Sequence, residues 1–259
     1  MTSKRTLQKR EEILGKTFDT VNYGRCFIID YNGCKNVTVM FYNPPYVTKC
    51  TMGNLLTGRV ANPYFPRVYG VGYIGVGKYS TKDKDVYKLW VRLMERTNCA
   101  TFKSRNPSYL DTSICDEWLN FQNFAEWCEQ QPSFRVKDNK GNSYQLDKDI
   151  LVKGNKVYST ETCCFVPQSI NVLLTKNDAK RGKFPIGVNF VESVGKYYAQ
   201  VNRIGLDRGL GYYETSEEAF EAYKQAKESY IKEVAEKWRG KIDDRVYEAL
   251  MNWEIHIDD

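Results

Sequence analysis

The 259-residue chain predicts an α+β protein in which small antiparallel sheets alternate with amphipathic helices. Three patterns support this expectation: alternating β-branched and aromatic runs near the N-terminus, apolar residues at helical spacing in the middle, and three short strand patterns before a long helix near the C-terminus. We expect a small N-terminal β-barrel-like domain, a central helical region followed by a ββα element, and a C-terminal three-stranded antiparallel sheet packed on one helix.

These patterns divide the chain into five segments. We expect a basic tail over 1–14, a small β domain with a Gly/Tyr-rich linker over 15–80, a helical and ββα region over 81–176, a sheet–helix domain over 184–240, and a helical tail over 241–259.

Composition narrows the class of partner. The net charge of +6 favours a polyanion partner, and no apolar run approaches the roughly 18 residues of a membrane span. Eight cysteines without a compact spacing, in a chain with no secretion signal, predict reduced thiols in a cytoplasm.

The N-terminal third predicts strands after a polar start. Residues 1–10 hold four basic and no acidic residues, which favours a disordered tail or an arm that contacts phosphates. Arg25–Tyr31 and Asn36–Phe41 form a predicted hairpin across Asn32-Gly33, and a third strand is expected near Tyr46–Cys50. We expect a small barrel or sheet that braces its neighbour.

A glycine-rich stretch resembles half of a phosphate-binding loop. Gly72–Lys78 fits G-x-x-x-x-G-K, but Tyr79 replaces the hydroxyl that would reach magnesium, and Pro63 and Pro66 stand where a buried strand should precede. We therefore expect a linker and not a nucleotide site.

Two amphipathic helices are predicted over 82–130. One has the apolar face Val86, Leu89, Trp90, Leu93 and Met94, surrounded by Lys82, Lys84, Lys88, Arg92 and Arg96. The other carries Trp118, Phe121, Phe124 and Trp127 at steps of three. We expect this aromatic stripe to be core and not a platform for stacking bases.

Residues 134–175 contain the candidate for catalysis. Strand patterns flank a turn at Asp138–Gly141, Asp147-Lys148-Asp149 follow, and Lys156–Tyr158 precedes a short helix that begins at Pro167 and contains Asn171. This order is the outline of a ββα-metal nuclease core, in which Mg²⁺ polarises a scissile phosphate. A solvated, charged turn is the alternative interpretation of the two aspartates.

The C-terminal module has the clearest pattern. Strands are expected at Val188–Ser193, at Tyr197–Ile204 and up to Tyr213, followed by a helix whose capping box is Thr215 and Glu218.

The faces of the second strand differ in chemistry. Tyr197, Ala199 and Val201 share the face expected under the helix, and Tyr198, Gln200 and Asn202 share the other, with Asn189 as a neighbour. Asn and Gln can pair with adenine through two hydrogen bonds, so the second face suits base reading, with a solvated face as the alternative.

The C-terminal motifs resemble a known DNA-binding family. The pattern G-V … G-K-Y-Y-A-Q-V … L-G-Y-Y-E-T-S-E-E-A-F-E-A-Y is similar to the APETALA2/ethylene-response-factor type domain, over about fifty residues. That resemblance implies a sheet in the major groove of double-stranded DNA. It places Asn189, Tyr198, Gln200 and Asn202 at the contacts, and Lys196, Arg203 and Arg208 complete the expected DNA-binding set.

A second resemblance covers the central region. The passages W90-V-R-L-M-E-R, C115-D-E-W-L-N-F-Q-N-F-A-E-W and L146-D-K-D … Y158-S-T-E-T-C-C … I170-N are similar to phage HNH homing-endonuclease-like proteins. The resemblance implies Asp147, Lys148 and Asn171 as catalytic residues, with Asp147 and Asp149 holding Mg²⁺. Thr162 stands where a metal-binding Asn is usual, and the only histidine, His256, lies far from the motif.

Together the two resemblances imply a phage or mobile-element DNA-binding protein in the cytoplasm of a bacterial host, with metal-dependent cleavage or nicking of double-stranded DNA. Two alternatives stay open. One is a catalytically degenerate DNA-binding regulator, and the other is a phage protein that binds and inhibits a host protein, for which nineteen tyrosines provide interface material.

Overall fold

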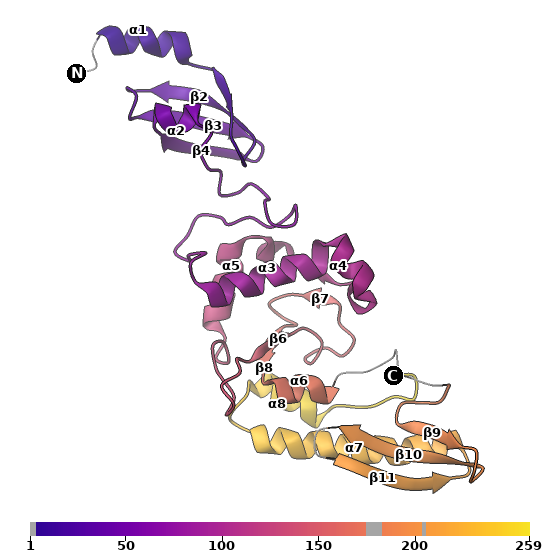
Figure 1. Cartoon of the computed structure of the whole chain (residues 1–259). Coiled ribbons are helices and arrows are strands. Elements are labelled where there is room, and N and C mark those ends of the chain that lie inside the picture. The colour runs from indigo at the N-terminus through magenta and orange to yellow at the C-terminus, as the bar shows by residue number, and fades with distance from the viewer. Residues whose placement is uncertain (1–3, 175–182, 204–205) are drawn as a thin grey trace. The chain divides into compact units, whose positions relative to one another are not determined.

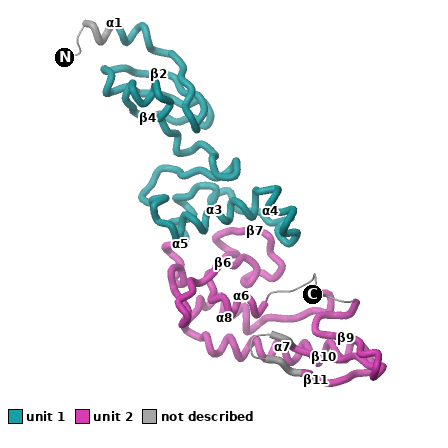
Figure 2. The backbone as a smooth tube through the Cα atoms, in the orientation of Figure 1, with its two compact units in different colours: residues 1–128 teal, residues 129–259 magenta. Residues whose placement is uncertain are grey.

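The computed structural model describes residues 4–174, 183–203 and 206–259, without the side chains of residues 4–7 and 202–208 (Figure 1). The chain forms two compact units, Met1–Cys128 and Glu129–Asp259 (Figure 2). No helix within the described ranges is long and apolar enough to cross a membrane.

The first unit begins with a four-stranded antiparallel sheet. Its strands β1 (Thr17–Asp19), β2 (Arg25–Tyr31), β3 (Val37–Tyr42) and β4 (Pro45–Cys50) pair in chain order. The predicted hairpin across Asn32-Gly33 is confirmed, with Gly33 at φ +104°, where glycine is favoured. The expected third strand is β4, whereas β1 was not predicted because three residues are too few to show alternation.

One face of this sheet packs beneath two short helices. Cys26, Ile28, Val39 and Phe41 are buried there with Ile13, which ends α1 (Lys4–Ile13), and with Leu55 of α2 (Met52–Leu56). The expectation of a barrel is not met among the described residues, because β1 and β4 each pair on one side only. Residues 4–13 form a helix instead of the expected disordered tail, anchored by buried Ile13 at its end.

The rest of this unit is mainly helical. It contains α3 (Lys84–Asn98), α4 (Ala100–Arg105), the 3₁₀ turns η1 (Pro107–Tyr109) and η2 (Asp116–Leu119), β5 (Ser113–Ile114) and the start of α5 (Phe121–Gln130). Of the predicted apolar face of α3, Val86, Trp90, Leu93 and Met94 are buried and Leu89 is half-buried. The predicted aromatic stripe is confirmed as core, since Trp118, Phe121, Phe124 and Trp127 are all buried.

The glycine-rich stretch 72–79 is docked on these helices. Tyr73 exchanges main-chain hydrogen bonds with Leu119 and Phe121, and the Gln122 side chain bonds to Ile74 and Tyr79. A Cβ at Gly72 would lie 2.9 Å from the Trp90 ring, so glycine here allows close packing. The phosphate-loop interpretation therefore gains no support from its setting, and the stretch is a packed loop and not a free linker.

The second unit opens with the expected ββα order. Strands β6 (Gln145–Asp147) and β8 (Cys164–Val166) pair antiparallel, and α6 (Gln168–Leu174) follows directly after Pro167; β7 (Val157–Tyr158) lies in the loop between the two strands. The sequence predicts that Ser143–Leu146 pairs with Phe134–Val136 across the turn at Asp138–Gly141. In the structure β6 pairs with β8 instead, and an isolated bridge between Lys137 and Ser143 is what the described residues form of that hairpin. All three β8 residues are buried, so its pattern is continuously apolar and lacks the alternation that identifies a strand.

The short helix α8 (Asp244–Met251) ends the second unit. Before it comes a three-stranded antiparallel sheet, which is covered on one face by α7 (Ser216–Trp238). Its strands β9 (Val188–Val191), β10 (Lys196–Arg203) and β11 (Leu206–Tyr213) lie in the order β11-β10-β9, with β10 in the centre. The predicted capping box is confirmed, since the Thr215 hydroxyl accepts from the Glu218 main chain and the Glu218 carboxylate accepts from Thr215. The C-terminal sheet packed on one helix is therefore as expected.

One hydrophobic core runs through the whole second unit. Buried residues of β8 and α6 (Cys164, Val166, Ile170 and Leu173) join those of β9 and β10 (Val188, Ala199 and Val201), of α7 (Ala219, Phe220, Tyr223, Ile231 and Ala235) and of α8 (Val246 and Leu250). The expected helical tail over 241–259 contains α8, whose residues Val246 and Leu250 are fully buried in this core.

Candidate nucleic-acid interface

The two faces of β10 are occupied as the alternation predicts. Ala199 and Val201 are buried in the core with α7, and Tyr197 packs against it. Tyr197 also contacts the rings of Phe190 and Phe184, at centroid distances of 5.0 and 5.3 Å. The helix thus covers one face of the sheet, and side chains on the other face point away from the core.

The register of the strands places three side chains in one row across the outer face of the sheet. Tyr198 is paired with Asn189 of β9 on one side and with Tyr212 of β11 on the other. Asn189 and Tyr212 are exposed and Tyr198 is half-buried. The structure therefore confirms Asn189 as the neighbour of Tyr198.

Tyr198 is held across β11 by packing. The centroid of its ring lies 5.0 Å from that of Tyr212. Its hydroxyl oxygen lies 1.9 Å from where a Cβ on Gly209 would be. A side chain at position 209 would require the Tyr198 ring to move. Gly209 thus leaves room for Tyr198 to lie across β11, a role that is visible only once the register of β10 and β11 is known.

The two amide side chains of the outer face remain uncommitted. Gln200 pairs with Gly209 in the register, and its main-chain N–H donates to the Gly187 carbonyl over 2.9 Å. Within the described part of the chain, neither the Gln200 nor the Asn189 side chain has a hydrogen-bond partner. An amide that is fixed by its strand and not yet bonded is the group that base-edge recognition requires.

The predicted DNA-binding cations of this sheet are less available than its amides. Lys196 forms an ion pair with Glu214, at 2.6 Å, so its charge is already partly balanced. Asn202, Arg203 and Arg208 belong to β10 and β11 by register, and their side chains lie outside the described residues.

Sequence reasoning missed Tyr212. It stands beside Tyr213 in L-G-Y-Y, and only one of two adjacent tyrosines can face outward. The register decides that Tyr213 lies opposite Tyr197, on the core face, and that Tyr212 lies on the outer face. The sequence signal that could have identified Tyr212 is the alternation of side chains along β11, counted backwards from the start of α7 at Thr215.

The second candidate site is the turn that follows β6. The Asp147 carboxylate accepts hydrogen bonds from the main-chain N–H groups of Asp149 and Ile150, at 2.8 and 3.0 Å. Burial, followed by the neighbouring Asp149 carboxylate, raises the pKa of Asp147 to about 7. Near neutral pH this side chain is therefore protonated in a large part of the molecules.

The other predicted catalytic residues, Lys148 and Asn171, contact neighbouring side chains of the same unit. The Lys148 ammonium lies 3.1 Å from Asp149 and 5.9 Å from the Tyr158 ring centroid, and its side chain is only 11% exposed. Asn171 of α6 donates to the Gln145 side chain over 3.0 Å. Asn171 thus contacts β6 at Gln145, two positions before Asp147.

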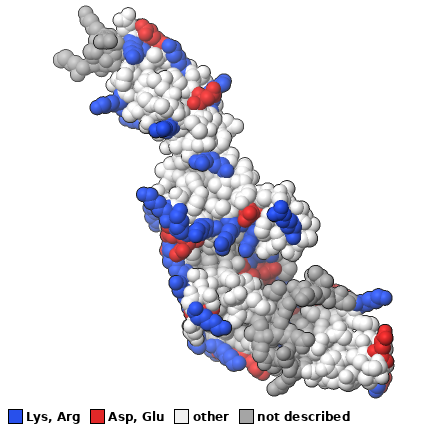
Figure 3. Space-filling view, viewed as in Figure 1, with Lys and Arg blue, Asp and Glu red and all other residues white. Residues whose placement is uncertain are grey.

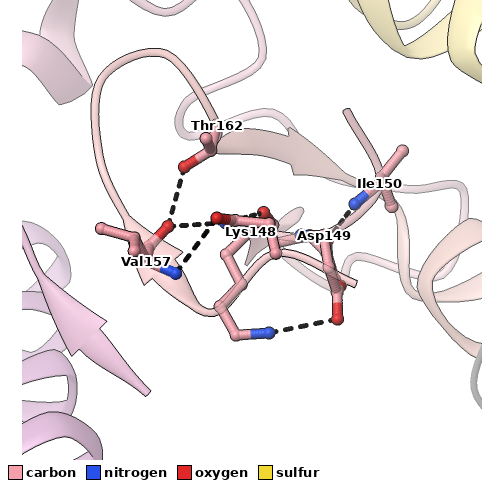
Figure 4. A network of polar contacts seen from close by, with 7 residues as sticks. Lys148, Asp149, Ile150, Val157 and Thr162 are labelled. Atoms are coloured by element: carbon pink, nitrogen blue, oxygen red, sulfur yellow. Dashed lines mark hydrogen bonds and ion pairs between the residues drawn. The ribbon is translucent and has the colours of Figure 1, made fainter. Parts of the chain in front are cut away.

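The loop between β6 and β8 is braced by its own polar side chains (Figure 4). The Asn155 amide donates to the carbonyls of Lys148 and Val157, both at 2.7 Å, and the Thr162 hydroxyl donates to Val157 over 2.8 Å. Thr162 therefore fastens the loop at the position where the resemblance places a metal-binding Asn.

The donor set does not fit the Mg²⁺ that the resemblance implies. Asp147 already accepts two main-chain hydrogen bonds, and Asp149 pairs with Lys148. Across residues 4–174, 183–203 and 206–259, no three side chains among His, Cys, Asp and Glu lie together as a metal would need. A hard cation takes several oxygen ligands, and this turn offers two carboxylates, one bonded to the main chain and the other paired with Lys148.

Comparison with known proteins adds no relative to this description. No family profile, no curated protein and no solved structure matches the chain.

Proposed function

We propose that this protein binds double-stranded DNA through the outer face of the β9–β10–β11 sheet. The observation that carries the proposal is the row Asn189–Tyr198–Tyr212 together with Gln200, on the face opposite α7. The two amides are uncommitted within the described residues, and the resemblance to the APETALA2/ethylene-response-factor type supports a duplex as the partner.

The β6–β8–α6 element serves in this proposal as a scaffold for that sheet. Its buried residues belong to the same core as Ala199 and Val201, and its polar residues bond to one another. Of the activities that the second resemblance implies, we therefore favour the catalytically degenerate DNA-binding protein over the Mg²⁺-dependent nuclease.

The test is a duplex-binding measurement with site-specific variants. A preferred site is first selected from a random duplex pool, and affinity is then measured by fluorescence anisotropy at one fixed salt concentration. Replacing Gln200 with Ala should weaken binding to the selected site by about 1–3 kcal/mol, or roughly 5- to 150-fold, if the amide reads a base. Binding to random duplex should change much less.

Gln225→Ala is the matched control, because Gln225 is an exposed glutamine on α7 of the same unit. It should leave both affinities unchanged. Equal losses on selected and random duplex for Gln200→Ala would contradict base reading. Mg²⁺-dependent nicking that Asp147→Ala abolishes would contradict the scaffold assignment while leaving the DNA-binding face in place.

A further inference from the structure

The helix α3 carries a row of basic side chains on its solvent side. Lys84, Lys88 and Arg92 are four residues apart and all exposed, which places them about 6 Å from one another along one face of the helix. Figure 3 shows Lys and Arg side chains gathered over α3. We call these three residues the α3 row.

The row is held on a rigid support. The opposite face of α3 is buried through Val86, Trp90 and Leu93, and the Trp90 indole donates to the Trp118 carbonyl over 2.7 Å. The direction in which the row points is therefore fixed by the core, so little order has to be imposed on the main chain when a ligand binds.

Neighbouring cations have structural partners, which separates them from the row. Arg96 lies over the Tyr109 ring, 5.6 Å from its centroid, and Lys103 donates to the carbonyls of Leu110 and Thr112. In contrast, no ion pair joins Lys84, Lys88 or Arg92 to a carboxylate in the described part of the chain.

The acidic residues in and beside α3 are outnumbered by basic ones. Asp83 caps the helix by accepting from the Asp85 main-chain N–H. Burial, followed by the negative charge of Glu95, raises the pKa of Tyr69, which places this carboxylate beside the Tyr69 hydroxyl. Over residues 82–105, seven basic residues stand against three acidic ones, so the local charge is positive.

We propose that the α3 row is a second duplex contact, which binds the sugar–phosphate backbone without reading sequence. The three residues of the row are cationic and regularly spaced, and none of them is aromatic as the anchors of protein interfaces often are, so a polyanion suits the row better than a protein. The inference shares its ligand class with the proposed function, but it does not depend on the β9–β10–β11 sheet.

The test changes the three charges together in the full-length protein. The Lys84→Gln, Lys88→Gln, Arg92→Gln triple variant should weaken binding to selected and random duplex by the same factor. Because each neutralised phosphate contributes about 0.9 to the slope of log K against log salt, the slope should fall by up to roughly 3. Glutamine is a good helix former, so α3 is retained, as a circular dichroism melt verifies.

The control is a Lys224→Gln, Lys232→Gln, Lys237→Gln variant of α7, which loses the same net charge where Glu228, Glu233 and Glu236 are interspersed. It should leave the slope nearly unchanged. A row variant that binds like the unaltered protein, or a control that loses as much, would overturn the α3 proposal. Neither result would contradict the proposal for the β9–β10–β11 sheet. That proposal is tested by whether Gln200→Ala weakens binding to the selected duplex more than binding to random duplex.

Discussion

The two sheets of this protein are similar in plan and different in how their cores are completed. The inner face of the N-terminal sheet is covered by residues from its own vicinity, between Ile13 and Val60. The β9–β10–β11 sheet instead shares its core with Ile150, Cys164, Val166 and Ile170, which precede it in the chain, and with α8, which follows α7. Three strands and one helix bury little apolar surface alone, so the ββα element stabilises the sheet.

Their outer faces differ as well. On the N-terminal sheet, Phe27, Met40 and Val47 are register partners in one row, and Phe27 stacks on Tyr42 with centroids 4.5 Å apart. This face has apolar and aromatic groups where the C-terminal sheet has Asn189 and Gln200. Base edges are read by hydrogen bonds, so the amide-bearing row of the C-terminal sheet suits that role better than the Phe27–Met40–Val47 row does.

The largest expected effect comes from breaking the shared core. Ile170 of α6 is fully buried, so Ile170→Ala should cost about 2–5 kcal/mol through lost burial and the cavity that remains. Hydrogen exchange followed by mass spectrometry should show faster exchange in β10 as well as in α6, because both contribute to one core.

Phe41→Ala is the matched change in the N-terminal sheet, where Phe41 is fully buried. It should cost about 3–5 kcal/mol and accelerate exchange in β2 and β3 while β10 keeps its protection. If Ile170→Ala left β10 unaffected, the scaffold role of α6 would be wrong.

The second prediction concerns pH and the turn at Asp147. The folded pKa of about 7 lies above the ordinary value, so the folded state retains a proton that the unfolded chain releases near pH 4. The contribution of this proton is therefore fully present below about pH 4 and is lost as pH rises through about 7. Asp147→Asn keeps the acceptor for the two main-chain N–H groups and cannot ionise.

Denaturant titrations at several pH values measure this effect. Relative to Asp147→Asn, the unaltered protein should lose unfolding free energy between about pH 4 and 7, by a few kcal/mol at most. Asp149→Asn removes the neighbouring negative charge and should shrink the loss. Equal pH profiles for the unaltered protein and Asp147→Asn would show that the carboxyl group is ionised throughout.

The third prediction tests one polar tie between α6 and α7. Lys227 is buried, and its ammonium donates to the Leu173 carbonyl near the end of α6 over 3.0 Å. Lys227→Met keeps most of the packing and leaves this carbonyl without that donor, at an expected cost of about 1–3 kcal/mol by denaturant titration. Lys224→Met, one turn earlier on α7 and less buried, should cost much less.

Much of this architecture was predictable where local chemistry decides it. The hairpin across Gly33, the α3 face and the capping box at Thr215 each follow from a short stretch and its own main chain. By contrast, β8 escaped prediction because Cys164–Val166 is buried on both faces and so has no alternation. The helix over residues 4–13 escaped because contacts near its end hold it to the sheet: Ile13 is buried in the core, and Arg10 forms an ion pair with Asp30 of β2.

The candidate site divides in the same way. Strand alternation was sufficient to place Tyr198 and Gln200 on the face away from α7. The roles of Gly209 and Tyr212 depend on the register between two strands, which a bulge between Ala199 and Gln200 shifts. Likewise, the sequence shows two aspartates beside Lys148, but only the folded turn shows that Asp147 is bonded to the main chain.

The smallest expected change in stability compares the outer faces directly. Tyr42 and Tyr212 are 54% and 51% exposed, and each packs against one ring, Phe27 or Tyr198. Replacing either with Ala should cost about 0.5–1.5 kcal/mol of stability, the worth of an aromatic pair, with the exposed position adding little.

Binding should separate these two variants. Tyr212→Ala frees the Tyr198 ring beside the amides, so affinity for the selected duplex should fall, whereas Tyr42→Ala should bind as the unaltered protein does. Fluorescence anisotropy on the selected duplex measures both. Equal losses would mean that the N-terminal face also contacts DNA, and the chemical difference between the two sheets would then not decide which one binds.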